Sequence, residues 1–235
     1  SNSFPQENIA RSPKIDIAID AGNDRFFQFD TTEESLLVVD LTNGVTSVVS
    51  TDPTPHLGKG LVVDGGRALI TAGTPELLAL DLGNGTISPI STAEIPNDTS
   101  PFTAAGDIAL DRDNNRAFIL DSGVSVFEVS LSDGARSILS DENTPDSTTT
   151  FGGLHMVLDS DNDRLLVVDS VIDQVVAVDL SDGASTIFSN NSTPNAANPF
   201  WHISTIALDS NNNQALVAGT IGAPDYGTVV FSVNL

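Results

Sequence analysis

The chain has 235 residues, enough for one large domain or two small ones at about 150 residues per domain. It carries 9 Lys and Arg against 32 Asp and Glu, for a formal net charge of −23. This charge repels phosphate backbones and anionic lipids, which argues against nucleic-acid and membrane partners. Cysteine is absent, which excludes disulfides, thiolate metal sites and a cysteine nucleophile. With 40% hydrophobic residues and no apolar run near membrane-spanning length, the composition predicts a soluble globular protein.

The N-terminal residues Ser1 to Pro5 show neither an initiating Met nor the basic and apolar regions of a signal peptide. We therefore expect a processed or truncated start. The acidic excess, the abundance of Ser, Thr and Asn, and the lack of cysteine would suit an exported bacterial protein. The composition thus predicts a secreted or periplasmic location.

One sequence pattern recurs five times along the chain: an apolar run ending in Asp, a polar turn, and a second apolar run. The terminal acids of the first runs recur at intervals of 44 to 50 residues, at Asp20, Asp64, Asp111, Asp159 and Asp209. Each run is short, rich in Leu and β-branched residues, and bounded by turn residues, which is typical of a strand.

A third strand follows in each unit, predicted at 36–40, 77–81, 124–130, 175–179 and 229–234. In four units it leads to a hairpin signal, Asn-Gly or Asp-Gly, in which both central residues can adopt the positive φ of a type I′ turn. These signals are Asn43-Gly44, Asn84-Gly85, Asp133-Gly134 and Asp182-Gly183. A fourth strand is then predicted at 45–50, 86–91, 135–140 and 184–189, whereas the fifth unit reaches Leu235 after its third strand.

A four-stranded meander of about 45 residues cannot bury both of its faces alone, and radial repetition covers them. The predicted fold class is therefore all-β, a β-propeller of four-stranded antiparallel blades with five sequence repeats, in a single domain over residues 1–235. Two arrangements stay open. Residues 3–9 could close a five-bladed ring against the last blade, or the chain could be a piece of a longer propeller.

The phrases at 108–111, 116–121 and 175–183 resemble the NHL-repeat and related six-bladed propellers. In those proteins a strand ending in Asp, a polar turn with Arg, and a hairpin closed by Asp-Gly recur. The resemblance covers nearly the whole chain, although five units are present here. It implies a fold and not an activity, because such propellers include protein-binding modules, sugar lactonases and lyases.

The turns after the first strands have oxygen-bearing side chains at alternate positions, as at the start of a calcium loop. The most acidic copy is Asp159, Asp161 and Asp163. These turns lack the Gly and Glu that complete a calcium loop, and Asp and Asn also favour ordinary turns. Turn chemistry is the preferred interpretation, and calcium at these three residues is the alternative. The Arg that ends four of the turns is expected to pair with the carboxylates.

A second set of acids, Asp30, Asp121 and Asp169, closes the second strand in three units. These carboxylates could ring the mouth of a ligand-binding face and hold a cation or a sugar hydroxyl. The simpler interpretation is that they cap strand ends in water.

Loops that join successive blades should reach the same face, and they carry His155, Trp201 and His202. An aromatic side chain beside carboxylates would suit a carbohydrate, peptide or protein ligand. We therefore predict a non-enzymatic binding propeller that needs no cofactor. The alternative is a calcium-dependent hydrolase resembling the sugar lactonases and lyases. Their calcium is held by a Glu, Asn and Asp set, and no Glu here starts a first strand, so catalysis is left open.

Overall fold

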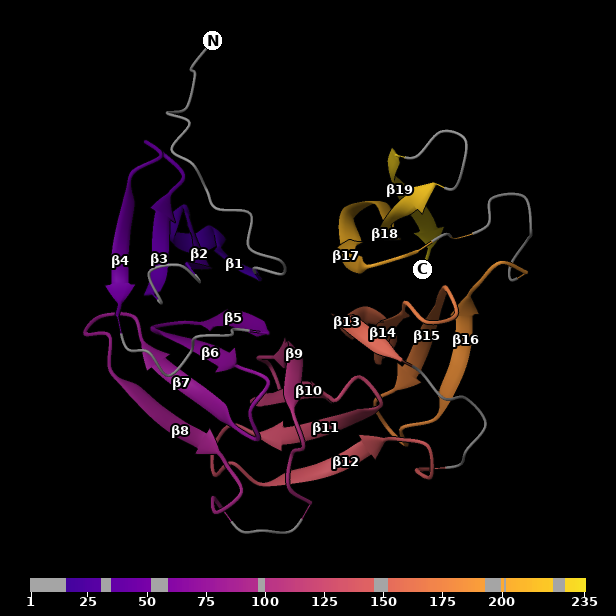
Figure 1. Cartoon of the computed structure of the whole chain (residues 1–235), viewed down its shortest axis with the longest axis horizontal. Helices are drawn as coiled ribbons and strands as arrows, with labels where there is room; N and C mark the ends of the chain where they lie inside the picture. The colour runs from indigo at the N-terminus through magenta and orange to yellow at the C-terminus, as the bar shows by residue number, and fades with distance from the viewer. Residues whose placement is uncertain are drawn as a thin grey trace. The chain divides into compact units, whose positions relative to one another are not determined.

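The computed structural model describes residues 16–30, 35–51, 59–96, 100–145, 152–192, 200, 202–221 and 227–235. These ranges form five antiparallel sheets with three short 3-10 turns (Figure 1). The chain divides into two compact units, Ser1–Ala105 (unit 1) and Gly106–Leu235 (unit 2). Within the described ranges, no helix is long and apolar enough to cross a membrane.

Unit 1 contains two sheets, and each follows the chain order of its strands. The first consists of β1 (Ile17–Asp20), β2 (Arg25–Asp30), β3 (Ser35–Asp40) and β4 (Thr46–Ser50), with the 3-10 turn η1 (Ala21–Asn23). The second consists of β5 (Gly60–Asp64), β6 (Arg67–Thr71), β7 (Leu77–Asp81) and β8 (Ile87–Ser91).

Unit 2 holds the other three sheets, again in chain order. The third sheet has β9 (Ala105–Asp111), β10 (Arg116–Asp121), β11 (Ser125–Ser130) and β12 (Arg136–Ser140). The fourth has β13 (Gly153–Asp159), η2 (Ser160–Asn162), β14 (Arg164–Asp169), β15 (Gln174–Asp179) and β16 (Ser185–Ser189). The fifth has β17 (Thr205–Asp209), η3 (Ser210–Asn212), β18 (Gln214–Ile221) and β19 (Gly227–Asn234).

The sheets are the blades of a β-propeller, which confirms the predicted fold class. Four blades have four strands, and the described part of the fifth has three, as the sequence predicted. Each blade is an antiparallel meander whose third strand lies between the second strand and, where present, the fourth. The prediction of a single domain over residues 1–235 stays a prediction.

The hairpins between third and fourth strands differ from the predicted type I′ turn. Only their glycines have a positive φ, between 73° and 76°, and each glycine N–H donates to the carbonyl four residues earlier. The preceding Asn or Asp instead uses its side-chain oxygen, which accepts the N–H two residues on at 2.8 to 3.1 Å. This local hydrogen bond replaces the second positive-φ residue.

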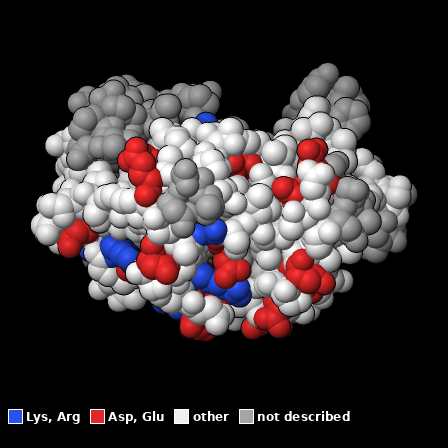
Figure 2. All heavy atoms as spheres, turned by 90° about the horizontal axis from the view of Figure 1, so that it is seen from below, with Lys and Arg blue, Asp and Glu red and all other residues white. Residues whose placement is uncertain are grey.

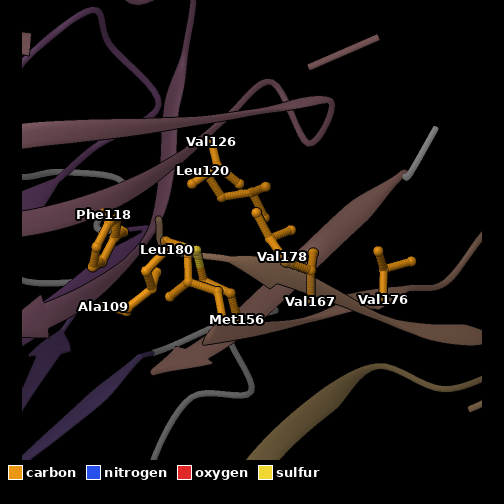
Figure 3. Packing of buried hydrophobic residues seen from close by; sticks show 10 residues of the cluster. Ala109, Phe118, Leu120, Val126, Met156, Val167, Val176, Val178 and Leu180 are labelled. Carbon is orange, nitrogen blue, oxygen red and sulfur yellow. The ribbon is translucent and has the colours of Figure 1, made fainter. Parts of the chain in front are cut away.

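Apolar side chains bury one face of a blade against the next blade in the same unit. Between the third and fourth blades, Phe118, Leu120 and Val126 pack with Met156 and Val167 (Figure 3). We call the face turned toward the next blade the forward face. Corresponding positions form the layer between the first and second blades, and the layer between the fourth and fifth. The core is therefore a series of interblade layers.

Candidate functional site

An Asp–Arg pair links the two ends of the turn after the first strand, and we call this pair, with the Asn that joins it in some blades, the Asp–Arg bracket. In the third blade, Arg116 Nε donates to Asp111 Oδ2 at 2.8 Å, and Asn114 Nδ2 donates to the same carboxylate. The equivalent pairs are Arg25 with Asp20, Arg67 with Asp64, and Arg164 with Asp159. These contacts confirm the expected pairing of Arg with the turn carboxylates, and Figure 2 shows basic side chains lying beside acidic ones.

In the third blade, the bracket lowers the pKa of Asp111. Burial alone would raise the pKa of Asp111, but the hydrogen bonds from Arg116 and Asn114 outweigh it and hold this pKa below its ordinary value. The guanidinium of Arg116 also lies 4.9 Å from the centre of the Phe118 ring, a cation–π contact. The turn is therefore held by charge and by packing together.

The predicted calcium residues lie at the turn of the fourth blade, where Asp159 belongs to one of these brackets. Asp159 is buried, and its carboxylate accepts from Asn162 Nδ2 at 3.0 Å and from Arg164 Nε at 2.8 Å. Asp161 and Asp163 are exposed, and Asp163 has a left-handed conformation. Among the described residues, no group of three His, Asp or Glu side chains could hold a metal ion. Calcium at Asp159, Asp161 and Asp163 stays a prediction.

The predicted ligand-binding acids occur in both units. Asp30 ends β2 of unit 1 and is half-buried. Asp121 and Asp169 end β10 and β14 of unit 2, and each is only 2% exposed. Asp169 Oδ1 accepts the backbone N–H of Val171 at 2.8 Å, so this carboxylate shapes the following hairpin. Direct ligand contact by these acids stays a prediction.

The hairpins after β10 and β14 lie close together in unit 2. The N–H of Gly153 donates to the carbonyl of Gly123 in the first hairpin. A Cβ placed on Gly152 would lie 2.7 Å from Val171 Cγ2 in the second hairpin. A side chain at position 152 would therefore force the exposed Val171 side chain to shift. Residues 152 and 153 join the two hairpins into one surface.

Three aliphatic side chains on these hairpins face solvent. Val124 is 55% exposed, Val171 77% and Ile172 58%. We call this set, with the exposed His202, the tip surface. Asp173 Oδ1 accepts the N–H of Ile203 at 3.1 Å, which ties the second hairpin to the loop that carries His202. The tip surface therefore combines exposed apolar area with an ordered backbone.

A buried acid that sequence reasoning missed lies in β9. Asp107 is 7% exposed, and its Oδ2 accepts the backbone N–H of Met156 in the next blade at 2.6 Å. The predicted ligand residue His155 lies beside it, with Nδ1 3.6 Å from the same oxygen. In unit 1, Asp16 makes the equivalent bond to the N–H of Leu61. The signal was available, because the phrase Asp-Ile-Ala-x-Asp starts at both acids.

The other two predicted residues differ in how far the structure describes them. Trp201 lies outside the described residues. His202 is exposed, with a φ of 46°, and belongs to the tip surface. In unit 2 the structure therefore brings His202 to the ordered hairpin tips that Asp169 shapes.

Comparison with known proteins places the chain by fold. No protein-family model matches it, and no curated protein matches it in sequence. A chain in the crystal structure of a nidogen/laminin complex is similar, with a TM-score of 0.65, 12% identity, and coverage of 87% of this chain and 75% of that one. These values confirm the predicted NHL-like propeller resemblance at the level of fold.

A second similar structure is a structural genomics protein of unknown function from Bacteroides thetaiotaomicron. Its TM-score is 0.65 at 12% identity, and the match covers 92% of this chain and 56% of that one. The chain therefore spans little more than half of the Bacteroides protein, and the similarity concerns the fold alone.

Proposed function

We propose that this chain is a non-enzymatic propeller module that binds a protein or peptide through the tip surface of unit 2. The observation that supports this is the exposure of Val124, Val171 and Ile172 on hairpins whose backbone is tied down. Burying an aliphatic side chain of this size contributes about 1.5 to 3 kcal/mol. An ordered surface also loses little conformational entropy when a partner binds.

The fold comparison is consistent with this proposal, since one similar chain comes from a protein complex, nidogen with laminin. The formal charge of −23 favours a neutral or basic partner. Export from the cytoplasm remains a proposal from composition alone. A carbohydrate ligand and a calcium-dependent hydrolase are the competing possibilities that the experiment must separate.

Peptide selection tests the proposal directly. A random peptide library displayed on phage is selected on the immobilised full chain, and affinities are then measured by titration. Replacing both Val171→Ser and Ile172→Ser should raise the Kd of selected peptides at least about tenfold, because most of their apolar contact is lost. Ile187→Ser serves as the control, since Ile187 is also exposed in unit 2 but lies on β16. It should leave the Kd within about twofold.

Equal affinity for the parent and the double variant would refute the tip surface as the peptide site. A glycan array supplies the second comparison. A glycan whose binding depends on Val171 and Ile172 would replace the protein ligand with a carbohydrate. Finally, EDTA should leave the melting temperature unchanged. A drop of several degrees would instead favour calcium at Asp159, Asp161 and Asp163.

A further inference from the structure

The charged side chains of unit 2 are divided between the two ends of its blades. We call the end with the Asp–Arg brackets the bracket end, and the opposite end, with the hairpins after β10 and β14, the tip end. By sequence, unit 2 holds four basic residues, all of them Arg. Arg112 lies in a bracket turn, Arg116 and Arg164 begin β10 and β14, and Arg136 begins β12, whose start pairs with the end of β11. All four therefore lie at the bracket end.

Carboxylates at the bracket end are offset by these guanidinium groups. Arg116 Nε lies 2.8 Å from Asp111 Oδ2, and its Nη1 lies 3.3 Å from Glu128 Oε1. Arg164 Nε lies 2.8 Å from Asp159 Oδ2. Opposite charges at these distances weaken each other's field in the surrounding solvent. The bracket end therefore supplies counter-charges of its own.

The tip end has carboxylates but none of the unit's Arg residues. Asp121 ends β10, Asp169 ends β14, and Asp173 immediately precedes β15. Asp141 and Glu142 follow β12 at the same end. Because every basic residue of unit 2 lies at the bracket end, no Lys or Arg of this unit offsets these acids locally. A potential of this sign attracts cationic groups toward the tip surface.

Two of these acids lie close in the fold to the exposed aliphatic side chains of the tip surface. Asp173 directly follows Ile172 and is half-buried. Glu142 is exposed and follows β12, whose last residue pairs with Val126 near the hairpin that carries Val124. The tip surface therefore combines exposed apolar area with a carboxylate near each hairpin.

We propose that the partner segment that binds the tip surface carries Lys or Arg next to its apolar residues. The apolar residues cover Val124, Val171 and Ile172, and the cationic groups lie at Glu142 and Asp173. The stems of Lys and Arg add apolar contact, and their charges speed association and fix the register of the segment. This inference rests on the proposed function, because it names the chemistry of the partner for the same surface.

Matched peptide libraries test the chemistry of the partner. Two phage libraries of the same peptide length, one with Lys and Arg allowed and one without them, are selected on the immobilised full chain. We expect the first library to yield the tighter binders. In synthetic copies of these peptides, replacing one Lys or Arg with Gln should raise the Kd about two- to fivefold, the range for exposed ion pairs. This difference should shrink as NaCl is raised from about 0.05 to 0.5 M.

A matched pair of chain variants tests where the charge acts. Glu142→Gln removes one negative charge at the tip end, and Asp113→Asn removes one from an exposed acid at the bracket end. Glu142→Gln should raise the Kd of the selected Lys- or Arg-containing peptides about two- to fivefold, and should leave the Kd of at least one of their Gln-substituted copies unchanged. Asp113→Asn should leave both values within about 1.5-fold, because solvent and salt screen a distant exposed charge.

Three results would overturn the proposal. Equal increases in Kd for the two chain variants would assign the effect to net charge alone. Equally tight binders from the library without Lys and Arg, still dependent on Val171 and Ile172, would refute the basic partner and leave the proposed function standing. Binders that do not respond to Val171→Ser and Ile172→Ser would refute the proposed function, and this inference with it.

Discussion

Replacing Asp107 with alanine should destabilise unit 2 far more than replacing an exposed carboxylate of the same blade. The carboxylate lies in β9, is 7% exposed, and accepts the N–H of Met156 in β13 at 2.6 Å. It therefore joins the first strands of two successive blades. Alanine removes the acceptor and leaves the buried N–H without this partner.

The expected loss in the free energy of unfolding follows from two contributions. A hydrogen bond to a charged group contributes about 1.5 to 3 kcal/mol, and a buried donor that loses its acceptor costs about 1 to 3 kcal/mol. These figures overlap because they describe one contact, so we expect Asp107→Ala to lower the free energy of unfolding by about 3 kcal/mol. Asp107→Asn keeps an acceptor oxygen and loses the charge, and should cost about 1 kcal/mol.

Urea unfolding followed by circular dichroism measures these differences. Asp113→Ala is the matched control, because Asp113 is an exposed acid in the turn of the same blade. It should change the free energy of unfolding by less than about 0.5 kcal/mol. Hydrogen exchange at Met156 gives a local measurement, and the rate should rise in Asp107→Ala. If Asp107→Ala cost no more than Asp113→Ala and left this amide protected, the carboxylate would not be joining the two blades.

Two other substitutions test the hairpins and the brackets. In thermal unfolding, Gly183→Ala should lower the free energy of unfolding by more than about 3 kcal/mol, because the new Cβ would lie 1.8 Å from the carbonyl oxygen of Leu139. Gly65→Ala is the control, because Gly65 also has a positive φ but a Cβ there would meet nothing within 4 Å. It should lower the free energy of unfolding by about 1 to 2 kcal/mol. Equal costs would contradict the close approach of this hairpin to β12. Because the pKa of Asp111 is lowered in the folded state, its contribution to stability is present above about pH 4 and is lost as the pH falls through the lowered value. As the pH is lowered from about 6 to 2, the melting temperature should therefore fall less steeply for Asp111→Asn than for the parent. If the two plots of melting temperature against pH were parallel, the Asp111 bracket would not contribute to the pH dependence of stability.

The blade could be predicted because its signals are local. An apolar run ending in Asp, with Arg five residues on, produces the turn in which Arg116 and Asn114 hold Asp111. The glycine that ends each predicted hairpin signal lies where it was expected. The turn type was wrong because side-chain oxygens such as that of Asn43 accept the N–H of the residue just before the next strand, here Val45. A dipeptide preference does not include that competing bond.

The candidate site was harder to predict, because its contacts join residues that are far apart in the sequence. Asp107 and Met156 are 49 residues apart, and although the repeated Asp-Ile-Ala-x-Asp pattern marks the acid, it does not identify Met156 as its partner. For the strand-end acids the sequence left two interpretations open, ligand binding and capping of strand ends, and it did not indicate that Asp121 and Asp169 are buried. The loop that carries His202 and the hairpin after β14 are joined by the bond from Ile203 N–H to Asp173, and a ligand at this end of the blades stays a prediction. The sequence could not indicate which side chains would be exposed.

The proposed binding surface lies on hairpins that differ from one blade to the next. A residue that recurs from blade to blade meets similar neighbours each time, so the Asp–Arg bracket, present in four blades, is explained by folding alone. The hairpin after β14 instead separates the paired residues Asp169 and Gln174 by four residues, and the hairpin after β10 separates Asp121 and Ser125 by three. The longer hairpin carries Val171 and Ile172 into solvent, which no interblade layer requires. Exposing two adjacent aliphatic residues gives the fold no benefit, and this is the physical argument for the proposed partner that buries them.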